Sequence, residues 1–198
     1  MKDILIIGSP RCGKSTLTNK FLERHPNYEP IRADSFLRVR QKEKSEHRYD
    51  EETHTNIVEI YSSTPEEIAF YIRDVLTGLK NDLNPINKNS IVDCCQISVE
   101  EAYNKFIKDC DIYCFGMPNI DLEELMIAIN ENDKEYDWTR VCGYYMFENL
   151  CRNIIRESKE NQKLCSKYGI KFFDMQGNRK EKIDAAINYI EALSLIHI

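Results

Sequence analysis

The sequence predicts an α/β fold in which helices cover both faces of a parallel sheet of five strands. Short apolar segments alternate with segments of helical periodicity along most of the chain, which is the pattern of βαβ units. The first apolar segment is followed at once by a glycine-containing loop and then by a helix. A chain of 198 residues is long enough for one such domain with a sizeable core and an insertion.

Five apolar segments are predicted to form the strands, and Gly8, Gly116 and Gly169 flank three of them as turn residues. The predicted strands cover residues 3–7, 29–34, 90–94, 111–115 and 170–174. Other segments have the spacing of apolar side chains that is typical of amphipathic helices. The predicted helices cover residues 14–24, 65–79, 99–108, 121–130, 141–167 and 178–195.

Two long segments interrupt this alternation. Residues 35–89 lie between the second and third predicted strands, and residues 132–168 lie between the fourth and fifth. The first segment contains a charged tract and then the amphipathic helix 65–79, for which Thr64 is the expected cap. The second segment consists mostly of the long helical pattern. We therefore expect a single domain over residues 1–198 that carries two helical inserts.

Composition argues against several classes of protein. The net charge of −6 and the isoelectric point of about 5.4 argue against a nucleic-acid partner. No apolar run approaches the ~20 residues that span a bilayer, so we expect no membrane partner. The N-terminal segment is too short and too strand-like for a signal peptide. The eight cysteines contain no C-x-x-C pair, which predicts reduced thiols in a cytoplasmic protein.

A phosphate-binding loop is the strongest motif in the sequence. The pattern G-x-x-x-x-G-K-[ST] is matched in full by Gly8, Ser9, Pro10, Arg11, Cys12, Gly13, Lys14 and Ser15, followed by Thr16. Its glycines allow successive backbone N–H groups to point at an anion, and the positive end of the next helix faces the same anion. Lys14 is expected to reach the β- and γ-phosphates, and the Ser15 hydroxyl is expected to bind Mg²⁺. The loop therefore predicts binding of ATP with magnesium.

Other nucleotide-binding classes fit the sequence less well. Neither the Asn-Lys-x-Asp nor the D-x-x-G motif of a GTPase lies at the end of a suitable strand. Asp93 is followed by Cys94 and not by the second carboxylate of a translocating ATPase. The length and layout instead resemble the small-molecule kinases of the nucleoside monophosphate kinase and shikimate kinase group. This resemblance implies a P-loop three-layer α/β/α fold, ATP as donor, an acceptor-binding insert at 35–89 and a lid-like insert at 132–168.

Three local features assign further candidate residues. The segment 31–38 is similar to the strand-Asp-x-Phe-x-Arg pattern of zeta toxin and chloramphenicol phosphotransferase relatives, which implies that Asp34 is the base for a hydroxyl acceptor. A turn or cap is the alternative role for Asp34, and nearby Arg38 is the best-placed cation for an acidic acceptor.

Asp93 resembles the third-strand aspartate that holds the magnesium shell through water in these kinases. Residues 172–179 resemble the loop that touches adenine, which implies a nucleotide contact for Arg179.

Two arginines of the second insert are candidates for contacts to phosphate. Arg152 and Arg156 lie four residues apart on one face of the long predicted helix. As catalytic lid residues they would grip phosphates, because a guanidinium offers fixed donors and keeps its charge. They fit equally well a solvated face paired with Glu148 and Glu160 at the same spacing. The sequence leaves both alternatives open.

These features together predict a phosphotransferase that moves the γ-phosphoryl group of ATP to a small-molecule hydroxyl acceptor. One alternative is a nucleoside monophosphate kinase of the adenylate type, whose acceptor phosphate needs no base. The other is a regulatory protein that binds ATP without phosphorylating an acceptor. The sequence identifies neither the acceptor nor the oligomeric state.

Overall fold

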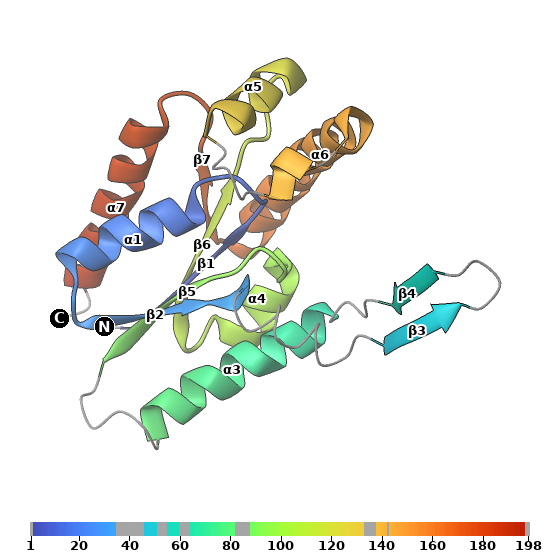
Figure 1. Ribbon diagram of the computed structural model, residues 1–198. Coiled ribbons are helices and arrows are strands. Elements are labelled where there is room, and N and C mark those ends of the chain that lie inside the picture. Colours follow the sequence, from blue (N-terminus) through green and yellow to red (C-terminus); the bar gives the residue numbers. More distant parts are fainter. Residues whose placement is uncertain are drawn as a thin grey trace.

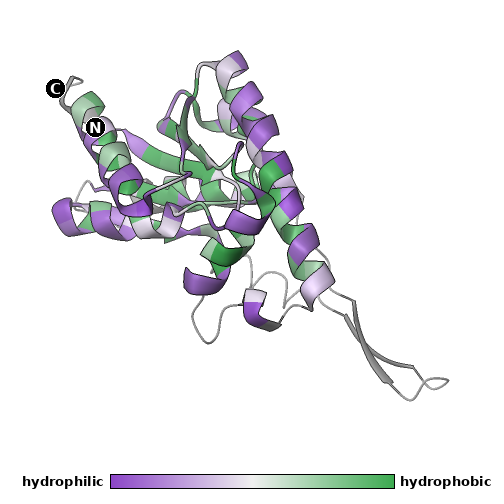
Figure 2. Cartoon of the chain, turned by 90° about the horizontal axis from the view of Figure 1, so that it is seen from above, coloured by the Kyte–Doolittle hydropathy of each residue, from purple (hydrophilic) through white to green (hydrophobic). Residues whose placement is uncertain are grey.

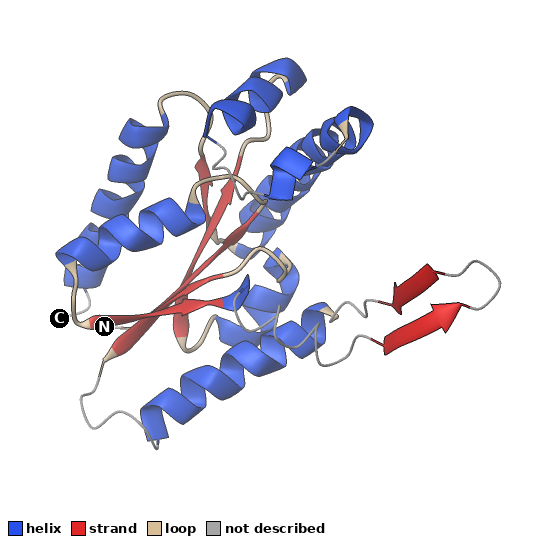
Figure 3. Ribbon diagram, in the orientation of Figure 1, coloured by secondary structure: helices blue, strands red, loops and turns tan. Residues whose placement is uncertain are grey.

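The computed structural model describes residues 2–34, 46–50, 55–59, 64–81, 88–132, 138–141 and 143–196. Its centre is a five-stranded parallel sheet in the order β2-β5-β1-β6-β7 (Figure 1; Figure 3), which confirms the predicted fold class. The strands are β1 (Asp3–Gly8), β2 (Tyr28–Arg32), β5 (Asn89–Asp93), β6 (Cys110–Gly116) and β7 (Lys171–Asp174). The central strand β1 is buried along its whole length, which explains its almost continuous apolar sequence.

Helices cover both faces of the sheet. They are α1 (Lys14–Arg24), α3 (Pro65–Asn81), α4 (Val99–Phe106), α5 (Leu122–Asn132), α6 (Tyr144–Tyr168) and α7 (Arg179–Ile196), with a 3₁₀ turn η1 (Trp138–Val141) before α6. In Figure 1, α1 and α7 lie on one face of the sheet, and α3 and α4 lie on the other. Every predicted helix is present, and α1 has the predicted bounds.

The sheet separates two hydrophobic clusters. Ile4 and Ile6 of β1 point into the cluster shared with α1 and α7, whereas Leu5 and Ile7 point into the cluster shared with α3 and α4. This alternation follows from the two-residue period of a strand. Figure 2 shows the apolar residues gathered along the sheet and the polar residues on the outer faces of the helices. In the described part of the chain, no helix combines the length and the apolar character needed to cross a bilayer.

Helix α6 belongs to both clusters. Its N-terminal half places Phe147 and Ile154 in the cluster with α1 and α7. Its C-terminal half places Cys165 in the cluster with α3 and α4. The helix ends at Gly169, which has a positive φ of 67°, and the Ile170 N–H donates to the Cys165 carbonyl oxygen at 3.0 Å. Most of the insert predicted at residues 132–168 is therefore one long helix that is packed on the core.

The segment at residues 35–89 includes strands as well as the predicted helix. It contains an antiparallel pair, β3 (Glu46–Asp50) and β4 (Thr55–Glu59), before α3. The sequence does not predict this pair, because β3 lies in a charged tract without a two-residue apolar alternation. Helix α3 agrees with the prediction, and its capping is reciprocal. The Glu67 N–H donates to Thr64 Oγ1 at 3.2 Å, and the Thr64 N–H donates to Glu67 Oε2 at 3.0 Å.

Candidate active site

The loop between β1 and α1 depends on its two motif glycines. Gly8 has a φ of 117° and Gly13 a φ of 89°, values that favour glycine. A Cβ atom on Gly8 would also collide with the carbonyl oxygen of Phe115 in β6. The Ser9 N–H donates to that same oxygen at 3.1 Å. The loop is therefore fixed to the end of the neighbouring strand, and its turn is open only to glycine at these positions.

Lys14 places a cation at this loop. The residue is 6% exposed, and its Nζ donates to the carbonyl oxygens of Gly8 at 3.1 Å and Ser9 at 2.7 Å. Lys14 is also the first residue of α1, whose N-terminal N–H groups lack intrahelical partners. Gly13, the N-cap, has no side chain that could cap them. An ammonium group and free helical N–H donors thus meet at one place, which is the chemistry that binds phosphate.

Ser15 and Asp93 form the second part of the site. The Ser15 hydroxyl donates to Oδ2 of Asp93 at 2.5 Å. Asp93 ends β5, and the register pairs it with Ile6 of β1, so the carboxylate reaches the edge of the sheet where the loop begins. Burial raises the pKa of Asp93, and the charge of Asp34 raises it further. Lys14 and the Ser15 hydrogen bond oppose this rise, because both favour the carboxylate.

The Ser15–Asp93 pair fits a magnesium ion. Mg²⁺ prefers hard oxygen ligands, and it usually combines one or two protein groups with water and substrate phosphates. Within the described ranges, no group of three or more His, Cys, Asp or Glu side chains could hold a metal ion without other ligands. A hydroxyl and a carboxylate oxygen next to a phosphate-binding loop are consistent with an ion that arrives with its nucleotide.

Asp34 lies at the same edge of the sheet, two residues beyond the end of β2. The sequence predicts Asp34 within the second strand, but residues 33 and 34 are already helical. Its exposed Oδ1 accepts a hydrogen bond from Gln96 Nε2 at 2.5 Å, and the Cys95 Sγ lies 3.9 Å from this oxygen. Because β2 and β5 are parallel neighbours, their carboxyl ends bring Asp34 close enough to Asp93 for the two charges to interact. The predicted Arg38 lies outside the described residues.

Arg179 adds a second cation beside the loop. It begins α7, and its Nη2 donates to the Arg11 carbonyl oxygen at 3.5 Å. A Cβ on Gly13 would lie 3.4 Å from Arg179 Nε, so the guanidinium packs against the loop backbone. Burial lowers the pKa of Arg179, and the charge of Arg11 lowers it further. The group still keeps its charge at neutral pH, since an arginine ordinarily titrates above pH 12.

The side chain of Arg11 links the loop to the second insert. Its Nη2 donates to Oγ1 of Thr139 in η1 at 2.5 Å, and Thr139 is buried. Among the described residues, Arg11 is the single non-glycine residue with a positive φ, at 63°. This conformation costs roughly 1–2 kcal/mol for an ordinary residue. The contacts of Arg11 with Thr139 and Arg179 offset part of that cost and hold the loop in its shape.

Ser158 is a site residue that the sequence analysis missed. It lies on α6, is fully buried, and its Oγ donates to Ser9 Oγ at 3.0 Å. The same oxygen accepts from the Met117 N–H at 3.0 Å. Ser158 therefore ties the phosphate-binding loop to α6 and to the segment after β6. A single serine in a long helix carries no sequence signal, because its partners are 149 and 41 residues away along the chain.

The two candidate lid arginines differ in their surroundings. Arg152 donates from Nε and Nη2 to Oε1 of Glu148, at 3.0 and 2.6 Å, which is the surface pairing that the sequence allowed. Arg156 is exposed, and within the described ranges it forms no ion pair. Partial desolvation raises the pKa of Glu157, while Arg156 and Lys14 lower it. This part of α6 is therefore within electrostatic reach of Lys14.

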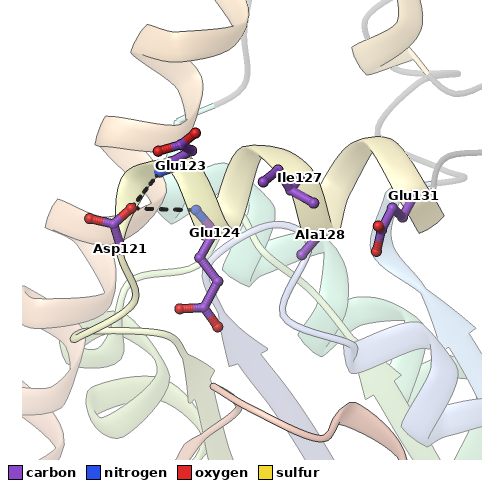
Figure 4. A pocket seen from close by; sticks show the side chains of 6 residues that line it. All are labelled: Asp121, Glu123, Glu124, Ile127, Ala128 and Glu131. Carbon is purple, nitrogen blue, oxygen red and sulfur yellow. Dashed lines mark hydrogen bonds between the residues drawn. The ribbon is translucent and has the colours of Figure 1, made fainter.

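A separate shallow hollow lies along α5 (Figure 4). Its volume is about 410 Å³, and its lining residues come from α5 and the residue before it: Asp121, Glu123, Glu124, Ile127, Ala128 and Glu131. Asp121 Oδ1 accepts from the N–H groups of Glu123 and Glu124 and so caps the helix. The acidic side chains that line the hollow would repel a phosphate group.

Solved structures share this fold at low sequence identity. A gluconokinase from Sinorhizobium meliloti 1021 is 11% identical, with a TM-score of 0.57 over 98% of this chain and 96% of that chain. A shikimate kinase from Acinetobacter baumannii, in complex with shikimate, is 12% identical, with a TM-score of 0.53 over 100% and 94%. The YorR protein from Bacillus subtilis, in complex with phosphorylated GDP, is 13% identical, with a TM-score of 0.50 over 95% of each chain.

These comparisons show the fold. The five-stranded parallel sheet with helices on both faces is the fold that this chain shares with the gluconokinase and the shikimate kinase. The resemblance to the nucleoside monophosphate kinase and shikimate kinase group is confirmed at this level. No protein-family model matches the chain, and no curated protein is significantly similar to it in sequence.

Proposed function

We propose that this protein is an ATP-dependent phosphotransferase that moves the γ-phosphoryl group of Mg-ATP to a hydroxyl group of a small molecule. The observation that carries this proposal is the placement of Lys14, Ser15, Asp93 and Asp34 at one edge of the sheet. Phosphoryl transfer asks a protein mainly to position two substrates and to stabilise charge. A gluconokinase and a shikimate kinase are among the structures that share the fold, which supports a small-molecule acceptor.

On the donor side, the loop backbone and Lys14 would bind the phosphates of ATP. Lys14 Nζ already lies at the loop, and it would exchange its two carbonyl partners for phosphate oxygens. Arg179, which packs against Gly13, adds positive charge on the side of the loop that faces α7. Magnesium, held by Ser15 and through water by Asp93, would supply charge neutralisation at the β- and γ-phosphates.

On the acceptor side, Asp34 would orient or deprotonate the hydroxyl. Its carboxylate is exposed and close to Asp93, so an acceptor that contacts Asp34 would stand near the phosphate end of the nucleotide. The chain enters the insert 35–89 directly after Asp34, and we assign acceptor binding to that insert, with Arg38 as the expected contact to an acidic acceptor.

A cytoplasmic location fits this function. In the described part of the chain, seven cysteines are free thiols. Burial raises the pKa of Cys12 to about 11 and that of Cys94 to about 12, so both thiols are protonated and unreactive at neutral pH. Reduced, buried thiols are typical of cytosolic proteins, which also have access to ATP.

An acceptor screen tests the proposal. Purified protein would be incubated with Mg-ATP and with sugars, sugar acids, hydroxylated ring acids, nucleosides or nucleoside monophosphates, and ADP release and the phosphorylated product would be measured. A product phosphorylated on a hydroxyl is the expected result. A nucleoside diphosphate as product would replace the proposal with a nucleoside monophosphate kinase. Tight ATP binding without acceptor-stimulated ADP release would indicate a regulatory protein.

We expect Asp93→Asn to raise the Mg²⁺ concentration that gives half-maximal activity by roughly 10–100-fold, the usual cost of losing an outer-sphere metal partner. The raised pKa of Asp93 means that its carboxylate is lost on acidification at a higher pH than for a solvated aspartate. The wild-type magnesium requirement should therefore rise early as the pH falls. Asp184→Asn, on the surface of α7, serves as the control. An unchanged magnesium titration of Asp93→Asn would remove this residue from the site.

We propose that the segment around residues 132–168 closes over the nucleotide, and that its movement centres on η1 and the start of α6. The rest of α6 is packed on the core, whereas Tyr144, Tyr145 and Met146 are exposed. A closing lid excludes water and completes a site. We therefore expect amide exchange over residues 138–150 to slow when a bisubstrate analogue binds, with little change over 160–168. Equal exchange with and without the analogue would indicate that neither Arg152 nor Arg156 reaches the phosphates.

A further inference from the structure

Gln96 is the residue that holds the carboxylate of Asp34. It lies three residues beyond β5 and is half-buried. Its Nε2 donates to Asp34 Oδ1 at 2.5 Å, and its Oε1 accepts from the Cys95 N–H at 3.2 Å. The Cys94 thiol also donates to Oε1, at 3.4 Å between sulfur and oxygen. The amide is thus held at both ends, and one of its partners, the Cys95 N–H, has a fixed hydrogen-bonding role.

These contacts determine which end of the amide faces Asp34. A backbone N–H can only donate, so the group next to the Cys95 N–H must be the Gln96 carbonyl oxygen. The NH₂ group is then left to face Asp34, where it requires an acceptor. An ionised carboxylate is such an acceptor at both of its oxygens. The backbone of Cys95 therefore fixes, through Gln96, the orientation of the Asp34 carboxyl group.

The second oxygen of Asp34 has a different environment. Within the described ranges, Oδ2 of Asp34 accepts no hydrogen bond from the protein, and the residue is exposed. One oxygen is thus held by the protein while the other is open to a ligand. We propose that Gln96 is a positioning residue for phosphoryl transfer, which fixes Asp34 through Oδ1 so that Oδ2 is presented to the acceptor hydroxyl. This inference rests on the proposed function, because it assigns Asp34 the role of base.

The charges near Asp34 show why a neutral amide is suited to this place. Among the described residues, the titratable groups near it include the carboxylate of Asp93 and the thiol of Cys95, on which the charges of Lys14 and, for Asp93, Arg32 also act. Asp93 is a second carboxylate, whereas burial raises the pKa of Cys95 to about 11, so that thiol carries no charge at pH 7. The Gln96 NH₂ donates a hydrogen bond to Asp34 without adding charge. A glutamate at position 96 would instead add a like charge at hydrogen-bond distance.

The first experiment measures the titration of Asp34 without any acceptor. The carboxyl carbons of aspartate are labelled with ¹³C, Asp34→Asn assigns the resonance, and its pKa is followed by NMR in the wild type, Gln96→Glu and Gln96→Leu. We expect Gln96→Glu to raise the pKa of Asp34 by about one unit or more, because two carboxylates would share one site. Gln96→Leu should raise it less, through loss of one hydrogen bond to the charged form. Asn104→Asp makes the same amide-to-acid change on the exposed face of α4 and should leave Asp34 unchanged.

The second experiment uses the acceptor that the screen identifies. For Gln96→Leu we expect kcat to fall on the order of 10²-fold, as for a misplaced catalytic group, with ATP affinity near that of the wild type. For Gln96→Glu the acidic limb of the pH profile of kcat should move to higher pH, because the base is active only when it is ionised. A purely structural role of Gln96 would lower the melting temperature without moving this limb.

The outcomes separate this inference from the proposed function. An Asp34 titration that is the same in Gln96→Glu and in the wild type would overturn the role of Gln96, whatever the acceptor. Full kcat in Gln96→Leu, with a wild-type pH profile, would overturn it as well. Failure of the wild-type protein to phosphorylate any hydroxyl acceptor would count against the function itself. In that case the titration still decides whether Gln96 holds Asp34 in its charged form.

Discussion

Lys14→Ala is expected to lower phosphoryl transfer by at least about 10³-fold and to weaken ATP binding, in a protein that remains folded. The size of the effect follows from the loss of a preorganised cation at the place where charge develops in the transition state. The fold should survive because, in the described part of the chain, the hydrogen bonds of the Lys14 ammonium go to two carbonyl oxygens of the loop, those of Gly8 and Ser9. The core residues of α1, such as Leu17 and Phe21, are not altered. ADP release and ATP affinity are the measurements.

Lys20→Ala provides a matched control on the same helix. Lys20 forms a surface ion pair with Asp184 at 3.3 Å, and such exposed pairs contribute little to stability. We expect wild-type activity and an unchanged circular dichroism spectrum for this variant. If Lys14→Ala were folded and still released ADP at the wild-type rate, the loop would not be the nucleotide site.

Asp34→Asn is expected to lower kcat by about 10²–10⁴-fold while ATP affinity stays near that of the wild type, because general base catalysis typically contributes that factor. The substitution keeps the shape of the side chain. The asparagine oxygen can still accept the hydrogen bond from Gln96 Nε2, so geometry is retained and only the base is lost. Steady-state kinetics with the acceptor from the screen, together with a separate ATP binding measurement, distinguish the two effects.

Asp109→Asn is the corresponding control, since Asp109 lies on the surface near Arg73, at 4.0 Å from Nη2. A fully active Asp34→Asn protein would reduce Asp34 to a turn residue. If the acceptor is a nucleoside monophosphate, no base is needed, and Asp34 would instead bind the sugar or the base of that acceptor.

Much of the fold could be predicted because its signals are local. The glycines at positions 8 and 13 mark a turn whose φ values only glycine adopts readily, and Pro26 follows the predicted helix 14–24. The observed strand ends differ from the predicted ones by one or two residues. Asp34 therefore lies in the helical residues after β2 and not in the predicted strand. The pair β3–β4 was not predicted because β3 is mostly charged and neither strand has a two-residue apolar period.

The site was only partly predictable because its contacts join distant segments. The motif identifies Lys14 and Ser15, and strand ends identify Asp93. By contrast, Gln96 is 62 residues from Asp34, and Thr139 is 128 residues from Arg11. Polar residues of this kind have no periodicity or motif of their own. They become site residues only when the sheet order brings the ends of β2, β5 and β1 together.

The position of α6 in both hydrophobic clusters bears on how the molecule unfolds. The layer with α1 and α7 and the layer with α3 and α4 both bury apolar side chains of this one helix, and Ser158 joins it to the phosphate-binding loop. Detaching α6 would expose apolar surface in both clusters and break the buried hydrogen bonds of Ser158 together. The two layers therefore form one cooperative unit. A ligand in the loop would stabilise this whole unit against global unfolding, because it binds the native state alone.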